Sequence, residues 1–149
     1  MADFSVFKCK LITRNRNLLD CMAHSVVVPA VDGQLGIMRS HCPIVSELGL
    51  GIMVAKNLLT HDGKPISDKH FLIDGGFVQV AENSVTVLAY DVTGFDGIAM
   101  EEVDLMVEKA EKILSADAYA TQLRSKDVKK AELIKQLAQL AKYAMENNP

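Results

Sequence analysis

The sequence predicts a mixed fold in which an all-β N-terminal sandwich is followed by a C-terminal α-helical hairpin. From Phe4 to about Asp91, short apolar and β-branched runs alternate with turn residues at the spacing of a β-sandwich or barrel. After a glycine-containing stretch without periodicity, apolar residues recur every three or four positions, as on amphipathic helices. We therefore expect a sandwich over residues 1–91, a linker over 92–98 and a two-helix antiparallel hairpin over 99–149.

The first predicted strand alternates between apolar and charged residues. Phe7, Cys9 and Leu11 share one parity, and Lys8 and Lys10 occupy the other. Successive side chains of a strand point to opposite faces of its sheet, so this pattern indicates one buried and one solvated face.

Turn-forming residues divide the rest of the sandwich. The predicted turns are Asn15–Asn17, Asp32–Gly33, a hairpin tip at His61–Pro65 and a reversal at Glu82–Ser84. Because proline cannot donate to a strand ladder, we expect the strand that starts at His24 to end at Pro29. Further strands are predicted within Leu35–Met38, Ile52–Ala55, Phe77–Val80 and Val85–Ala89.

Helical periodicity begins directly after the predicted linker. One apolar stripe predicts a helix over about 99–114, with acidic residues early and lysines late, as the helix dipole favours. A second stripe, rich in alanine, predicts a helix that begins between Asp117 and Asp127 and ends near Met145. Since short helices are marginal alone, we expect the two to pair and to lie on the sandwich. Alanine buries little area, so we expect a weakly held, movable hairpin.

Composition excludes several classes of function. A net charge of −3 argues against a nucleic-acid partner, because such partners select basic domains. Three cysteines without C-x-x-C spacing indicate neither a disulfide framework nor a zinc site, and they fit a reducing compartment. The chain shows no signal-peptide pattern and no apolar run of membrane-spanning length. We expect any membrane association to depend on partners, without direct insertion.

No catalytic or metal-binding arrangement is predicted. His41 and Cys42 are adjacent on a strand, where neighbours point to opposite faces and cannot share a proton. The four histidines lack the spacing of a metal site, and the sequence contains no P-loop motif for nucleotide phosphates. We therefore expect a non-enzymatic protein without a cofactor. Four glycines are predicted to adopt positive φ or to allow close backbone approach: Gly33, Gly36, Gly75 and Gly76.

Two glycine motifs carry a family resemblance. Residues 26–43 read VVVPAVDGQLGIMRSHCP, residues 71–80 read FLIDGGFVQV, and residues 85–89 read VTVLA. This pattern resembles the epsilon subunit of the rotary proton-translocating ATP synthases. The resemblance implies a non-catalytic rotor subunit that binds the gamma subunit of the central stalk and the membrane ring of c subunits. It also implies a helical tail that restrains ATP hydrolysis. Cysteine use and the lack of a transit-peptide pattern favour a location at the cytoplasmic face of the bacterial inner membrane.

The resemblance places a loop of the sandwich near the ring. In the family an acidic residue often stands between the two glycines of this loop, whereas this chain has Gln34, so a neutral hydrogen bond would replace a charge pair. One apolar or aromatic face of the sandwich is expected to pack on gamma. The residues implied at the ring and stalk interface are Gln34, Leu35, Gly36, Ile37, His41 and Pro43.

The start of the first helix resembles a nucleotide motif in degenerate form. Some family members bind ATP through an [I/L]-D-x-x-R-A motif, and here Asp104 is kept while Val107 and Glu108 replace the arginine and alanine. Lysine does not reproduce the planar donor fork of arginine. We therefore expect no ATP binding of physiological strength.

A basic stretch precedes and enters the second helix. Two interpretations are open. The stretch is a solvated helix face, or, as the resemblance implies, its residues contact acidic segments of the catalytic beta subunits when the hairpin extends. The cations are Arg124, Lys126, Lys129, Lys130, Lys135 and Lys142.

Two other functions are compatible with the residues. One is an unrelated β-sandwich protein-binding module with a helical docking tail, which a stoichiometric complex with gamma would exclude. The other is a small hydrolase or transferase that uses Cys42, whose activity would disappear in Cys42→Ser.

Overall fold

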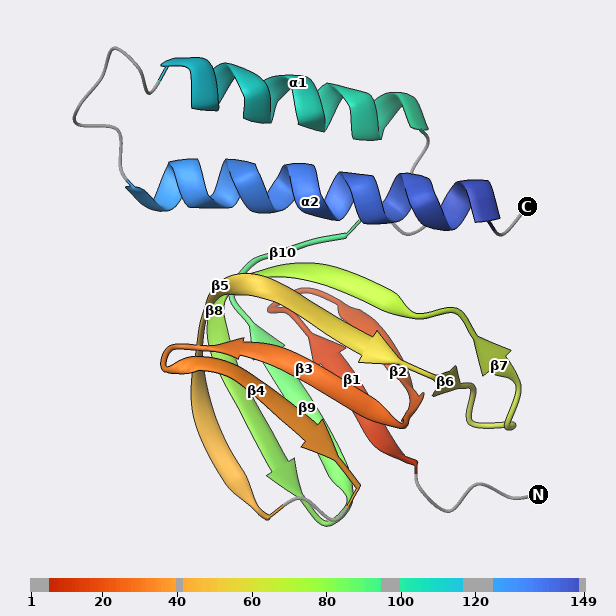
Figure 1. Ribbon diagram of the computed structural model, residues 1–149. Coiled ribbons are helices and arrows are strands. Elements are labelled where there is room, and N and C mark those ends of the chain that lie inside the picture. Colours follow the sequence, from red (N-terminus) through yellow and green to blue (C-terminus); the bar gives the residue numbers. More distant parts are fainter. Residues whose placement is uncertain (1–5, 40–41, 95–99, 117–124, 148–149) are drawn as a thin grey trace. The chain divides into compact units, whose positions relative to one another are not determined.

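The computed structural model describes residues 6–39, 42–94, 100–116 and 125–147. The chain divides into two compact units, Met1–Thr93 and Gly94–Pro149. The first is a β-sandwich and the second contains two helices (Figure 1), so the predicted fold class is confirmed.

Ten strands form one continuous sheet in the order β4-β3-β5-β8-β9-β1-β2-β6-β7, with β10 paired to β8. All neighbours are antiparallel except β1 and β9. The strands are β1 (Phe7–Ile12), β2 (Asn17–Ala23), β3 (Ser25–Ala30), β4 (Gly33–Met38), β5 (Ile44–Lys56), β6 (Leu58–Leu59), β7 (Pro65–Ile66), β8 (Lys69–Ala81), β9 (Ser84–Ala89) and β10 (Val92–Thr93).

Two long strands turn this sheet into a sandwich. β5 and β8 each run for 13 residues and pair from Ile44 and Val80 to Ala55 and Lys69. Both curve strongly along their length (Figure 1), which carries each from one layer into the other. On its other edge, β8 pairs with β10 before Gly75 and with β9 after it. The layers therefore share β5 and β8.

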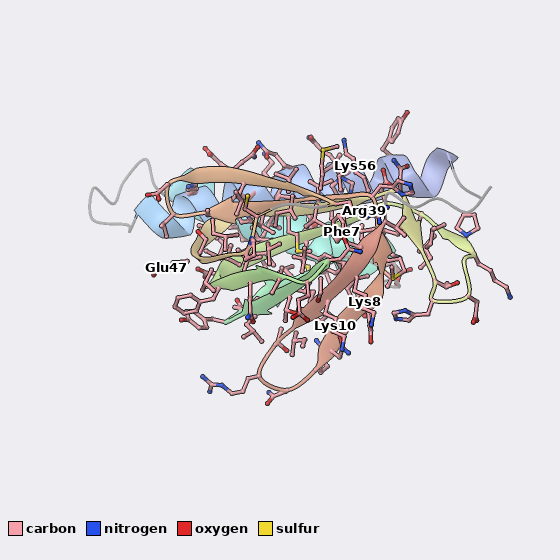
Figure 2. All side chains as sticks on the ribbon, turned by 90° about the horizontal axis from the view of Figure 1, so that it is seen from below. Phe7, Lys8, Lys10, Arg39, Glu47 and Lys56 are labelled. Atoms are coloured by element: carbon pink, nitrogen blue, oxygen red, sulfur yellow. The ribbon has the colours of Figure 1, made fainter. Side chains whose placement is uncertain are left out.

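The core lies between the two layers. Phe7, Cys9 and Leu11 are buried in it, whereas Lys8 and Lys10 lie on the other side of β1 (Figure 2), as the alternation predicted. The other buried members come from β2–β6, β8 and β9: Leu19, Cys21, Ala23, Val26, Val28, Ile37, Leu48, Met53, Ala55, Leu58, Phe71, Ile73, Val78, Val80, Val85, Val87 and Ala89.

The predicted turns are present. Thr13 N donates to Arg16 O at 2.8 Å, and the β8–β9 reversal places Glu82 and Asn83 at φ values of 49° and 59°. Positive φ at both central residues is the geometry that matches the twist of a two-residue hairpin. Thr60 N donates to Lys64 O at 2.8 Å and closes the hairpin tip between β6 and β7.

Three strand predictions were wrong. β3 continues through Pro29, because its register with β5 shifts between Val27 and Ala30 and Gly51 leaves room for the proline ring. β5 begins at Ile44 rather than Ile52, since pairing with β8 continues across its glycines. Two residues of the predicted linker, Val92–Thr93, form β10 on β8.

The second unit contains α1 (Met100–Ala116) and α2 (Ser125–Asn147), which pack against each other. Lys142 Nζ lies 2.8 Å from Asp104 Oδ1, and Lys135 Nζ lies 3.9 Å from Glu111 Oε1. A later residue of α2 therefore meets an earlier residue of α1, which makes the pair antiparallel. Apolar positions that are buried here are Ala110, Ala131, Leu137 and Ala138.

Candidate functional site

The first candidate surface is the hairpin of β3 and β4. The two strands pair down to Ala30 and Gly33, so a two-residue turn connects them. Val31 N at this turn donates to Glu47 O at 3.1 Å, which ties the hairpin to β5. Backbone bonds on both sides therefore hold the hairpin in a fixed shape.

The residues predicted at this surface differ in accessibility. Ile37 is 1% exposed and belongs to the core, and Leu35 is half-buried against it. Both side chains therefore contribute mainly to packing. Three of the predicted residues are exposed, namely Gln34, Gly36 and Pro43. His41 lies outside the described residues.

The backbone requires glycine at position 33 but not at position 36. Gly33 has a φ of +127°, which side chains rarely adopt, whereas Gly36 has no positive φ and nothing within 4 Å of an added Cβ. The prediction that Gly36 serves a turn or a close approach was therefore wrong, and the fold does not require glycine there.

The exposed side chains of β4 are uncharged, whereas the exposed Asp32 and Arg39 lie just before and just after this strand. Met38 on β4 and Val31 at the turn are exposed apolar side chains, and they flank Gln34 and Gly36. β4 itself carries no charged residue. We call Val31, Gln34, Gly36 and Met38 the β4 stripe; it suits a partner surface that is apolar or neutral and polar.

A second candidate surface lies on the outward side of β5, β8 and β9. Phe77 stands opposite Leu88 in the ladder, and its ring contacts that of Tyr90 edge-on at 6.2 Å between centroids and 81° between planes. Val45 lies on β5 at the other side of β8. We call these four the apolar patch; they are Val45 (67% exposed), Phe77 (42%), Leu88 (50%) and Tyr90 (68%).

The two glycines of β8 shape this patch. A Cβ on Gly76 would lie 2.1 Å from Leu88 O, and one on Gly75 would lie 2.9 Å from Tyr90 Cδ2. Both residues have positive φ, +80° at Gly75 and +137° at Gly76. Glycine here lets β9 approach closely and lets the Tyr90 ring lie across the β8 backbone.

An apolar face on the sandwich was predicted from the sequence, but its residues were not. Strand alternation could have indicated them. Phe77 points to the same side of its strand as the polar Gln79, and Leu88 points to the side opposite Val87 and Ala89. A strand with large apolar residues at its outward positions leaves them exposed only if no second layer covers that face. The tertiary structure alone decides this.

In the helical unit, one residue of the predicted basic stretch pairs with one residue of the nucleotide motif. Asp104, the retained residue of the nucleotide motif, pairs with Lys142, while Val107 is half-buried and Glu108 is exposed. Lys135 pairs with Glu111. Of the other predicted cations, Lys129 is exposed and Lys130 half-buried, Arg124 lies outside the described residues, and so does the side chain of Lys126.

The titratable groups of the sandwich have structural roles. Burial, with the neighbouring Cys21 and Asp20, raises the pKa of the Cys9 thiol to about 12. His24 Nδ1 lies 2.9 Å from Asn57 O, and His61 Nε2 lies 2.9 Å from Asp20 Oδ1, which ties the β6–β7 tip to β2. Within the described ranges, no three His, Cys, Asp or Glu residues gather as a metal site would require.

The sequence matches the family of ATP synthase delta/epsilon chain β-sandwich domains over residues 6–95. The chain belongs to this family. It is 43% identical over 90 residues to the ATP synthase epsilon chain of Symbiobacterium thermophilum, which covers 60% of this chain and 58% of that relative. With the epsilon chain of Desulfitobacterium hafniense it shares 31% identity over 127 residues, covering 85% of this chain and 86% of the relative.

The family also agrees in fold. A chain in the cryo-EM structure of the Euglena gracilis mitochondrial ATP synthase (OSCP/F1/c-ring, rotational state 1) superposes with a TM-score of 0.54 at 17% identity, covering 92% of this chain and 79% of that one. Membership as an ATP synthase epsilon chain sets aside the alternative of an unrelated binding module. No helix in the described part of the chain has the length and apolarity needed to span a membrane.

Proposed function

We propose that this epsilon subunit of the ATP synthase central stalk is non-catalytic and couples proton flow to ATP synthesis by joining two rotor parts. The apolar patch would bind the gamma subunit, and the β4 stripe would meet the membrane ring of c subunits. Through these partners the subunit would sit peripherally at the cytoplasmic face of the bacterial inner membrane. The observation that carries the proposal is the exposed apolar patch on a rigid sandwich.

The apolar patch has the properties of an interface core. Interfaces concentrate their binding energy in a few aromatic and large apolar side chains at the centre of the contact. Phe77, Leu88 and Tyr90 are such side chains, and the β8–β9 ladder holds their backbones in place. Because loops are more mobile than strands, a patch held by a sheet is better suited to transmit torque than a loop contact.

The β4 stripe is proposed to face the ring. It is neutral, and Gln34 offers an amide that donates and accepts hydrogen bonds with a polar loop. Pro43 at the approach to β5 is exposed near the end of the same hairpin. His41 is proposed to belong to this contact by its match to the family pattern.

The test of the gamma contact compares two surfaces of the same sandwich. We expect Leu88→Gln to weaken binding of purified gamma by about tenfold or more, as loss of a central interface side chain does. Met38→Gln removes an apolar side chain that is at least as exposed, 67% against 50% for Leu88, from the β4 stripe and serves as the matched control. Equal affinities for both variants would contradict the assignment of the apolar patch to gamma.

We further propose that the helical hairpin restrains ATP hydrolysis. Lys142 and Lys135 are paired with carboxylates of α1, so they can reach acidic segments of the catalytic beta subunits only after the helices separate. Partly exposed ion pairs contribute about 0–1 kcal/mol each, which makes them a weak latch. The closed hairpin would not bind ATP, because Lys142 occupies the Asp104 carboxylate and α1 carries no arginine.

The test measures ATP hydrolysis by the reconstituted catalytic complex. A chain that ends at Gly94 keeps β10 and lacks both helices, and we expect higher turnover with it than with the full chain. Asp104→Asn with Glu111→Gln removes the latch and should deepen inhibition. Glu101→Gln with Glu102→Gln removes the same charge from exposed positions of α1 and should leave turnover unchanged. Equal turnover of full and shortened chains, both bound, would refute a regulatory hairpin.

A further inference from the structure

A polar hollow of about 320 Å³ adjoins the apolar patch. One wall is the β1–β2 turn and the other is the segment that leads from β9 to β10. Tyr90 belongs both to this hollow and to the apolar patch, so the two are continuous. The lining residues are Thr13, Arg14, Asn15, Arg16, Leu18, Tyr90, Asp91 and Val92.

Hydrogen bonds fix both walls. In the turn, Thr13 N donates to Arg16 O at 2.8 Å and Arg16 N donates to Thr13 Oγ1 at 3.2 Å. On the other wall, Tyr90 N donates to Gly75 O at 3.1 Å, and the carbonyl of the next residue accepts from Asp74 N at 3.0 Å. The hollow is therefore a preformed feature of the sandwich.

The hollow carries a local excess of positive charge, although the protein as a whole is acidic. Arg14 and Arg16 are both exposed, and neither guanidinium has a hydrogen-bond or ion-pair partner within the described part of the chain. Asp91 is the one acidic residue among the lining residues, so two positive charges face one negative charge. The chain as a whole carries a net charge of −3.

We propose that this hollow receives an aspartate or glutamate side chain from the same stalk subunit that covers the apolar patch. The inference rests on the proposed function and deepens it. A guanidinium offers planar paired donors that match a carboxylate, and two of them here have no partner among the described residues. The arrangement is that of an interface with an apolar centre and a charged rim.

The shape and lining favour a protein carboxylate over a free nucleotide. Small-molecule sites enclose most of their ligand and are lined mainly by apolar groups. This hollow is only partly enclosed, and most of its lining residues are polar or charged. Rim charges steer association and make it salt-dependent, so the acidic segment would orient the partner as the apolar patch docks.

The experiment measures the affinity of the full chain for purified gamma at about 50 mM and about 500 mM NaCl, where charge screening differs strongly. We expect Arg14→Gln with Arg16→Gln to weaken binding about tenfold at low salt and much less at high salt. Arg39→Gln with Lys64→Gln removes the same charge from exposed positions outside the hollow and should match wild type. Arg14→Lys with Arg16→Lys should retain most of the salt dependence.

Each outcome separates this inference from the proposed function. If wild type does not bind gamma, the proposed function fails. If Leu88→Gln weakens binding while the double arginine variant behaves like its charge-matched control, only the inference is overturned. Binding of ATP or inorganic phosphate to the isolated chain, lost in Arg14→Gln with Arg16→Gln, would also overturn it, because the hollow would then be a phosphate site.

Discussion

Replacing Gly76 by alanine should destabilise the sandwich strongly. Gly76 has a φ of +137°, and an added Cβ would lie 2.1 Å from Leu88 O and 2.8 Å from Ala89 Cα. Both contacts are with backbone atoms of β9, which pairs with β8 at this position. The neighbouring strand therefore cannot yield by rotating a side chain, and the pairing itself must shift.

Two costs add at this site. A residue held in a backbone region that side chains rarely adopt costs about 1–3 kcal/mol. Overpacking that displaces the backbone costs about 1–3 kcal/mol more. Together we expect a loss of about 4 kcal/mol, a large part of the roughly 5–15 kcal/mol by which domains are stable.

Gly36 supplies the matched control, because its backbone has no positive φ and its surroundings are open. Gly36→Ala should change the free energy of unfolding by less than about 1 kcal/mol. Urea denaturation followed by circular dichroism measures both variants. If Gly76→Ala unfolds within about 1 kcal/mol of wild type, the close approach of β9 does not explain this glycine.

The Gly36 position also allows a functional test of the β4 stripe. Gly36→Gln should fold normally, because the added side chain points into open space on the β4 stripe. If the β4 stripe faces the ring, this variant should impair ATP-driven proton pumping in reconstituted vesicles while stability stays unchanged. Normal coupling in the well-folded variant would count against a ring-facing role.

Three further outcomes are expected. Cys42 is exposed and should react with a thiol reagent in the native state, whereas Cys9, whose pKa burial raises to about 12, should react only on unfolding; equal rates would contradict the burial. Burial lowers the pKa of His70 below its ordinary 6.5, so the unfolded state binds the proton more tightly and stability should fall as pH drops through 6.5. His70→Gln should flatten that pH dependence in acid titrations; an unchanged slope would exclude His70 as its source. Glu82→Asn suits the positive φ of 49° at this position of the β8–β9 turn and keeps the hydrogen bond from Asn83 Nδ2 to Val6 O, so it should stabilise the sandwich by up to about 1 kcal/mol in urea melts; no gain would argue against that turn geometry.

Patterns that depend on neighbours in the chain could be predicted from the sequence. The alternation of Phe7, Cys9 and Leu11 gave the buried face of β1, because the strand period is local. The turn at Glu82–Ser84 and the periodicity of both helices were likewise readable. The motifs around Gly33 and Gly75 indicated the family, since each is contiguous in the sequence.

Long-range contacts decided the features that sequence reasoning missed. Pro29 remains inside a strand because Gly51, far along the chain, leaves space for its ring, and β5 extends to Ile44 because β8 pairs with it throughout. Asp104 was expected as a motif remnant, but its salt bridge to Lys142 exists only because the helices run antiparallel.

The sequence by itself determined the fold class, the turns, the helical periods and the family, because each is encoded in local spacing or in contiguous motifs. The tertiary structure decided which apolar residues stay exposed. Leu88 is no less apolar than Val87, yet Val87 is buried between the layers while Leu88 joins Phe77 and Tyr90 on the outer face. Exposure depends on what the rest of the chain covers, and only the folded sheet brings Arg14 and Arg16 beside that face.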